Sequence, residues 1–94
     1  MSPSSKLAAL LAEVRACRRC APELPLGPRP IVQIGAGARI LIASQAPGRI
    51  AHRSGTPFAD RSGAALRLWL GIEALTFYDP ERIAILPQGL CYPG

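Results

Sequence analysis

The stretch ILIASQAPGRIAHRSGTPFADRSG, residues 40–63, decides how this chain is expected to fold. It opens with four consecutive apolar residues, Ile40–Ala43, a pattern typical of a strand covered on both faces of a parallel sheet. Residues 44–63 then contain three glycines and two prolines, and connections this long are uncommon in compact domains and often functional. Because ligands of open α/β sheets bind beyond the carboxyl ends of the strands, we expect a binding site where this strand ends.

A helix and a second strand are expected after this connection. Ser62 is a suitable N-cap for a helix that ends at Gly71. The apolar residues of that helix that we expect to face the core are Leu66, Trp69 and Leu70. Residues 83–86, IAIL, predict a second buried strand that ends at Pro87. A strand, a long connection, a helix and a strand form the right-handed crossover unit of a parallel sheet.

The N-terminal part predicts a helix, an extended tether and a strand. Ser4 or Ser5 is expected to cap a helix whose apolar positions recur every three or four residues, at Leu7, Leu10, Leu11 and Val14. Residues 21–30 contain four prolines, which exclude helix and predict an extended path. The runs 31–34 and 39–43 flank Gly-Ala-Gly, so we expect either a hairpin or a strand entered through a turn. These glycines precede the strand, which excludes a dinucleotide-binding fingerprint.

Length and composition favour one small globular unit. The chain has 94 residues, of which 49% are hydrophobic. Because no helix follows the second strand, residues 1–94 are expected to be the N-terminal part of a single, apparently truncated domain. No run approaches the length of a membrane span or reads as a secretory signal, so we expect a cytoplasmic protein without a membrane partner.

The charge of the chain is positive and concentrated. Eleven basic residues against six acidic ones give a net charge of +5, which suits an anionic partner and equally a merely basic soluble surface. Asp60 is the one carboxylate among the arginines of the central stretch, which are Arg39, Arg49, Arg53, Arg61 and Arg67. Phe58 lies in the same stretch, where its ring can stack on a nucleobase or anchor the loop to the core. His52 has no visible partner, and we assign it no role.

Three cysteines indicate metal or thiol chemistry. Cys17 and Cys20 form a CxxC pair, a spacing that suits both metal binding and redox exchange. A redox pair normally begins a helix, where the dipole lowers the thiol pKa, whereas this pair follows one, so metal binding is favoured. Cys91 comes just after the second predicted strand and can return to the same site. Three thiolates leave a four-ligand zinc or iron-sulfur site one ligand short.

In their order and spacing these segments together resemble the uracil-DNA glycosylase superfamily, in particular the N-terminal portion of its iron-sulfur branches, families 4 and 5. The segments that carry the resemblance read CRRC, PELPLGPRP, SQAPG, SGTPFADRSG, LWLG and LCYPG. The resemblance implies a three-layer α/β/α sandwich with a central parallel sheet. It also implies a DNA repair enzyme that hydrolyses the N-glycosidic bond of uracil, or of a related damaged base, after flipping it out of DNA.

The resemblance assigns roles to residues beside the predicted strand ends. Gln45 matches the acidic residue of the GEAPG motif, which makes it the candidate catalytic residue, with its amide orienting a water molecule. Ala46 falls where other branches carry a water-positioning Asp or Asn, and Pro47 and Gly48 complete the predicted substrate-binding turn. Phe58 matches the ring that stacks on the flipped base.

Three further sets of residues complete the expected site. Gln88 neighbours Pro87, which stands where the family has an Asn that reads the base edge, and is the candidate substitute. The expected phosphate contacts are Arg49, Arg53 and Arg61, and the expected ligands of a 4Fe-4S cluster are Cys17, Cys20 and Cys91. The family's fourth cysteine and its HPS-type loop have no counterpart among the 94 residues. Two other hypotheses stay open, a non-catalytic nucleic-acid-binding module stabilised by metal and a thiol redox protein, as does zinc or no metal in place of the cluster.

Overall fold

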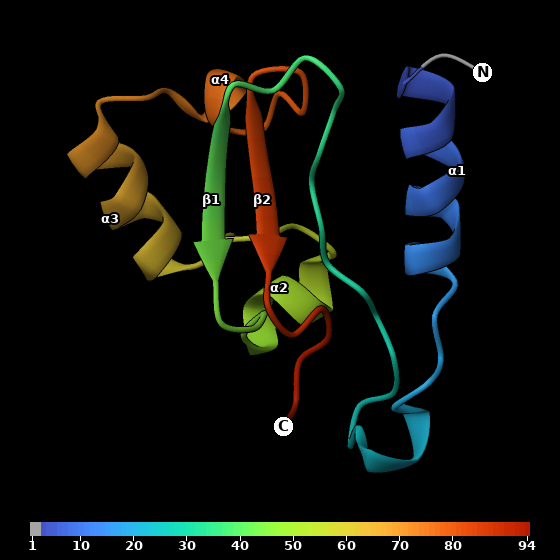
Figure 1. Cartoon of the computed structure of the whole chain (residues 1–94). Coiled ribbons are helices and arrows are strands. Elements are labelled where there is room, and N and C mark those ends of the chain that lie inside the picture. The colour runs from blue at the N-terminus through green and yellow to red at the C-terminus, as the bar shows by residue number, and fades with distance from the viewer. Residues whose placement is uncertain (1–2) are drawn as a thin grey trace.

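The computed structural model describes residues 3–94, in which helices flank a two-stranded parallel sheet (Figure 1). The elements in chain order are α1 (Pro3–Arg15), η1 (Ala21–Glu23), β1 (Ile40–Ser44), α2 (Arg49–Ser54), α3 (Arg61–Leu70), α4 (Ala74–Phe77) and β2 (Ile83–Pro87). The strands pair in parallel register from Ile40 with Ile83 to Ser44 with Pro87. The expected α/β class with a parallel sheet is therefore confirmed. In the described part of the chain, no helix has the length and apolar character needed to cross a membrane.

β2 lies between β1 and the chain segment around Gln33, which precedes β1 in the sequence. Gln33 forms an isolated antiparallel bridge with Ile85, through hydrogen bonds of 3.0 and 2.6 Å between their backbones. The predicted hairpin of residues 31–34 with 39–43 is thus wrong, and the alternative of a strand entered through a turn is correct. The reason is the Gln33 side chain, whose Nε2 donates to the carbonyl oxygens of Phe77 and Ile83, 2.9 and 2.8 Å away. These bonds hold the segment against α4 and β2.

The core sits on β2 and α4. Phe77, Ile83 and Ile85 are completely or almost completely buried and form its centre. By contrast, Leu41 on β1 is 59% exposed, so the expectation of a strand covered on both faces is wrong for β1, although it holds for most of β2. β1 is the outer strand of this sheet and has a pairing partner on one side. Its outer edge and neighbouring side chains consequently remain open.

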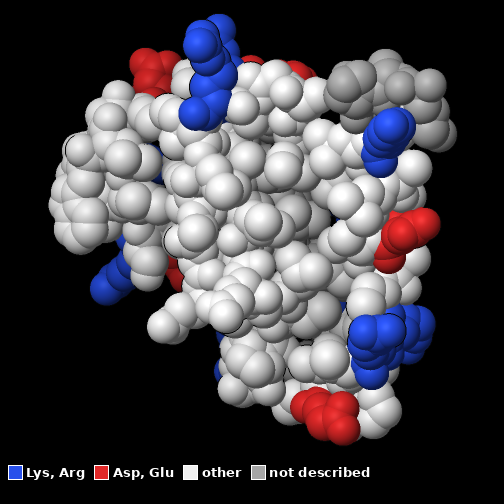
Figure 2. Space-filling view, viewed as in Figure 1, with Lys and Arg blue, Asp and Glu red and all other residues white. Residues whose placement is uncertain are grey.

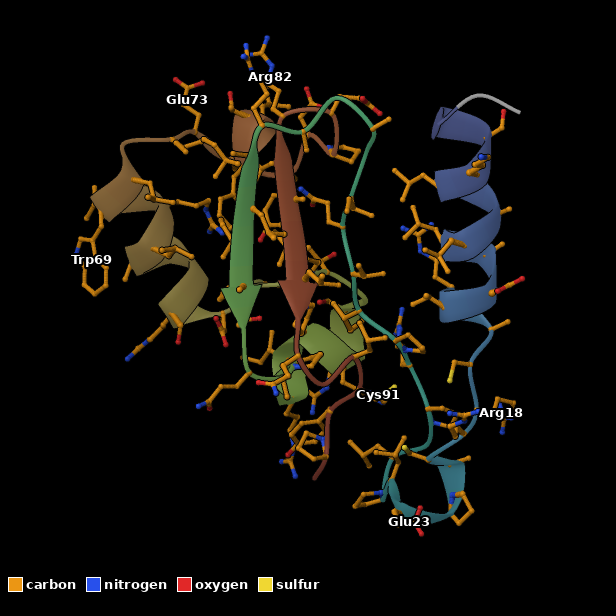
Figure 3. All side chains as sticks on the ribbon, viewed as in Figure 1. Arg18, Glu23, Trp69, Glu73, Arg82 and Cys91 are labelled. Carbon is orange, nitrogen blue, oxygen red and sulfur yellow. The ribbon has the colours of Figure 1, made fainter. Side chains whose placement is uncertain are left out.

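α3 begins and turns differently from the prediction. Asp60, and not Ser62, is its N-cap, because the Asp60 side chain accepts a 3.1 Å hydrogen bond from the backbone N–H of Gly63. The helix ends at the left-handed Gly71, as expected. Trp69 does not pack in the core as expected; it is 82% exposed and points away from the sheet (Figure 3). The inward face of the helix contains the buried Gly63 and, as expected, Leu66, which packs against the core.

The N-terminal helix and the tether follow the sequence pattern with two differences. α1 begins at Pro3, a residue suited to the first helical position, so Ser4 and Ser5 lie within the first turn and do not precede the helix. The tether is interrupted by the single 3-10 turn η1, which begins just after Cys20. Beyond η1 the chain runs between α1 and β2 (Figure 1).

Candidate functional site

A cavity of about 230 Å³ lies at the carboxyl ends of the two strands. Ser44 and Pro87, the last residues of β1 and β2, contribute to its wall. α2, which lies beneath both arrowheads in Figure 1, contributes Ala51. The sequence predicted a ligand site at this position, and the fold provides a hollow there.

The structure brings most of the predicted substrate-binding residues to this cavity. Its lining includes Ala46, Pro47, Gly48 and Phe58. Gln45, the candidate catalytic residue, is exposed and directly adjoins Ala46, but it does not belong to the lining. Gln88 is exposed in a different hollow, beside the cysteines, although its backbone N–H donates to Ser44 O at 2.8 Å. The cavity therefore collects residues of the first strand-to-helix connection and leaves Gln88 outside.

Phe58 is both a cavity wall and an anchor. Its half-buried ring lies edge-on to the ring of Phe77, with centroids 6.1 Å apart and an interplanar angle of 81°. Among the described residues it is the one non-glycine residue with a positive φ, 55°. Such a backbone conformation costs about 1–3 kcal/mol and persists where the surrounding structure enforces it. Of the two roles that the sequence left open for Phe58, the geometry shows the anchoring contact, and stacking on a base stays a prediction for a ring that lines the cavity.

Two side chains hold the backbone at Phe58. The Phe58 carbonyl accepts hydrogen bonds from Arg67 Nη1 at 3.2 Å and from the Tyr78 hydroxyl at 3.0 Å. The same hydroxyl lies 2.8 Å from the carbonyl of Pro57 and accepts from Arg67 Nη1 at 3.1 Å. Burial raises the pKa of Tyr78 above its ordinary value of 10.0, against the opposing effect of nearby Arg67, so its hydroxyl stays protonated at neutral pH. The sequence analysis assigned no role to either side chain.

Asp60 is the single ionisable residue among the described residues that line the cavity. Its Oδ1 caps α3, as described above, whereas Oδ2 lies on the side of Gly48, where an added Cβ would come within 3.9 Å of it. Sequence reasoning did not select Asp60 as a functional residue. A signal was nevertheless present, because Asp60 is the sole carboxylate between Glu23 and Glu73.

The three candidate phosphate contacts are exposed, and two of them directly adjoin cavity residues. Arg49 follows the cavity residue Gly48, and Arg61 lies between the cavity residues Asp60 and Ser62. Among residues 3–94, Arg82 Nε and Asp79 Oδ2 form the one ion pair, at 3.5 Å. Arg49, Arg53 and Arg61 therefore have no carboxylate partner in this part of the chain. Figure 2 shows the basic side chains of one face in separate groups at its rim, with no continuous stripe.

The three cysteines border one hollow of about 400 Å³. Cys17 and Cys20 are exposed and Cys91 is half-buried, and all three are free thiols. Figure 3 shows Cys91 on the C-terminal segment that faces the tether. Thiolates are suitable ligands for zinc or an iron-sulfur cluster, so the donor type fits. Within the described residues, however, no three or more His, Cys, Asp or Glu side chains converge closely enough to hold a metal ion.

Comparison with known families identifies the chain. A family profile described as the uracil DNA glycosylase superfamily matches residues 32–93, which are 62 of the 94 residues. The matched region contains both strands, every cavity residue except Ile31, and Cys91, and it begins after Cys17 and Cys20. The parallel sheet, the cavity at its carboxyl edge and this match agree, and the chain belongs to the uracil DNA glycosylase superfamily.

Proposed function

We propose that the cavity binds a uracil or a related damaged base that has been flipped out of DNA, and that the chain contributes to hydrolysis of its N-glycosidic bond. The observation that carries the proposal is that Phe58 and the turn Ala46–Gly48 line the same cavity at the strand ends. A volume of about 230 Å³ is smaller than the roughly 300–1,000 Å³ of most drug-sized ligand sites, which favours a single base as occupant. A base inside the duplex is inaccessible to such a pocket, so it has to be extruded.

Asp60 is the group that we propose for the chemistry. In hydrolysis the bond between the sugar C1′ and the base nitrogen breaks, its electron pair leaves with the base, and a water oxygen bonds to C1′ while losing a proton. A carboxylate beside the base can stabilise the cationic sugar and accept that proton. Asp60 is the carboxylate available in the cavity, and Gln45, next to the lining, remains the proposed amide that orients the water.

The surroundings of the cavity supply proposed contacts to the DNA backbone. Arg49, Arg53 and Arg61 are exposed and without carboxylate partners in the described chain, as phosphate contacts require. Such contacts make DNA binding strongly salt-dependent. We therefore expect replacement of each arginine to weaken binding to all DNA sequences similarly.

The cysteine hollow is the proposed site of a 4Fe-4S cluster, with Cys17, Cys20 and Cys91 as three of its ligands and zinc as the alternative. The shared hollow and the free thiols support the proposal. Anaerobic purification followed by iron, sulfide and zinc analysis tests it, with Cys91→Ser expected to lower the metal content. A metal-free protein that reduces disulfides would instead support a thiol redox function for Cys17 and Cys20.

The proposed function is tested by single-turnover release of uracil from a uracil-containing oligonucleotide. We expect Phe58→Leu, which keeps an apolar side chain but removes the stacking face, to lower the rate by roughly tenfold or more. Trp69→Leu is the matched control, because this exposed aromatic residue on α3 does not line the cavity. Equal rates for wild type and Phe58→Leu would contradict the proposed pocket.

A second candidate function is a nucleic-acid-binding module without catalysis. It is favoured by one observation, the position of Gln45 outside the cavity lining. This module would bind DNA in a salt-dependent manner and release no base. The same oligonucleotide assay, run alongside a binding titration, separates the two functions.

A further inference from the structure

We propose that Arg67 and Tyr78 are positioning residues that hold the ring of Phe58 in the base cavity. This inference deepens the proposed function and rests on it, because it explains how the stacking surface is kept in place. Neither side chain lines the cavity, so both act through Phe58.

The backbone at Phe58 needs an external restraint. Its φ of 55° is a conformation that a non-glycine residue rarely adopts unless its surroundings require it. α3 approaches the strained residue so closely that a Cβ at Gly63 would overlap the carbonyl group of Phe58. The ring therefore extends from a backbone that is compressed against the first turn of α3.

The hydrogen bonds at this point form a connected set. Arg67 Nη1 donates both to Phe58 O and to the Tyr78 hydroxyl oxygen, at 3.2 and 3.1 Å. The hydroxyl has one proton and lies within 2.8 Å of Pro57 O and 3.0 Å of Phe58 O, so it restrains two consecutive carbonyls. Three parts of the chain, α3, the loop and the residue after α4, are thereby joined at the carbonyl of Phe58.

The position of Arg67 fits this role better than contact with DNA. Its guanidinium lies over the rings of Phe77 and Tyr78, with Cζ 5.4 and 5.5 Å from their centroids. It is half-buried, whereas Arg49 and Arg61 are exposed. Phe77 also meets the Phe58 ring edge-on, so the same aromatic group supports both Arg67 and the stacking ring.

The consequence is a specific pattern of losses. Removing the Tyr78 hydroxyl or the Arg67 guanidinium leaves the ring of Phe58 chemically intact but frees its backbone. The chemical step after DNA binding should slow, by about three- to tenfold for loss of the hydroxyl, while binding to undamaged DNA is unchanged. A residue with only a structural role would lower stability without moving the Phe58 ring in the folded protein.

The test observes the ring directly by fluorine NMR of protein labelled with 4-fluorophenylalanine. The wild-type chain has two phenylalanines, so two resonances are expected, and Phe58→Leu assigns them. Each Tyr→Phe variant adds a third labelled ring and a third resonance, which is assigned by combining that variant with Phe58→Leu. Tyr78→Phe and Arg67→Met should shift or broaden the Phe58 resonance, and Arg67→Lys should restore part of the change. Tyr92→Phe and Arg39→Met are the matched controls, because their side chains lie outside the hydrogen-bonded set.

The outcomes separate the two proposals. A cooperative thermal transition shows whether the Tyr78→Phe and Arg67→Met proteins remain folded. If they are folded and the Phe58 resonance has not moved, the positioning role is overturned. A moved resonance in a chain whose wild-type form neither binds nor cleaves uracil-containing DNA would support the positioning role and refute the proposed function. A moved resonance with slower single-turnover cleavage supports both.

Discussion

Gly63→Ala tests the contact on which the geometry of Phe58 depends. A Cβ at residue 63 would lie 2.5 Å from the carbonyl carbon and 2.7 Å from the Cβ of Phe58, and would also overlap the carbonyl oxygen. Because these atoms belong to the backbone and its first side-chain carbon, no rotamer change relieves the overlap, and the loop has to move away from α3. In a helix alanine is favoured over glycine by about 1 kcal/mol, whereas overpacking costs about 1–3 kcal/mol.

The expected net effect is therefore a loss of up to about 2 kcal/mol in the free energy of unfolding, measured by urea denaturation followed by circular dichroism. Gly89→Ala is the control, because a Cβ there would meet Gln45 O and Ala46 Cβ at ordinary contact distances of 3.5 and 3.6 Å. We expect the control to change stability by less than about 0.5 kcal/mol. A Gly63→Ala protein that is as stable as wild type and keeps the Phe58 resonance would refute the argument.

Three further changes probe the cavity and its surroundings. Gly48→Ala adds a methyl group whose nearest atom outside the adjoining residues is Asp60 Oδ2, 3.9 Å away. It should therefore weaken binding of a uracil-containing oligonucleotide with little loss of stability in thermal melting. Unchanged affinity would argue against a base in this cavity. Asp60→Asn keeps a capping oxygen but removes the charge, so single-turnover cleavage should fall by about tenfold or more without destabilisation, with Glu73→Gln as control. Burial raises the pKa of Tyr78 above 10.0, with Arg67 lowering it and Asp60 raising it, so the folded state loses stability as the pH rises past about 10. The free energy of unfolding, measured by urea denaturation at a series of pH values, should therefore fall less steeply with pH in Tyr78→Phe than in wild type. Equal slopes for the two proteins would contradict the burial of the hydroxyl.

Local patterns predicted α1, β1, α3 and β2, because each depends on neighbouring residues, but they missed the short helices α2 and α4, whose segments were expected to be loops. The apolar periodicity of α1, the run that forms β2 and the left-handed Gly71 all appear where expected. The pairing of Gln33 with β2 was not predictable in the same way, since its partner Ile85 lies 52 residues further along the chain. A polar side chain within an apolar run was the available hint, because a buried amide has to find partners.

The site was predicted from its position at the strand end, but its internal supports were not. The sequence favoured Leu66, Trp69 and Leu70 as the inner face of α3, because apolar residues normally decide which face is buried. Leu66 does pack against the core, but Trp69 is exposed, and Arg67 lies against the aromatic rings because the Phe58 carbonyl and the Tyr78 hydroxyl accept hydrogen bonds from its guanidinium. These acceptors lie in the loop and at Tyr78, outside α3, so the periodicity of the α3 sequence could not predict them.

Asp60 and Phe58 are not placed independently of each other. The Asp60 carboxylate caps α3 at Gly63, and the same glycine is the residue against which the Phe58 carbonyl is packed. Asp60 also acts electrostatically on Tyr78, whose hydroxyl restrains that carbonyl. A change that shifts the start of α3 therefore moves the proposed stacking ring and the proposed catalytic carboxylate together. The one carboxylate of this basic stretch therefore has two structural roles, because it fixes the start of α3 and lines the cavity at the strand ends.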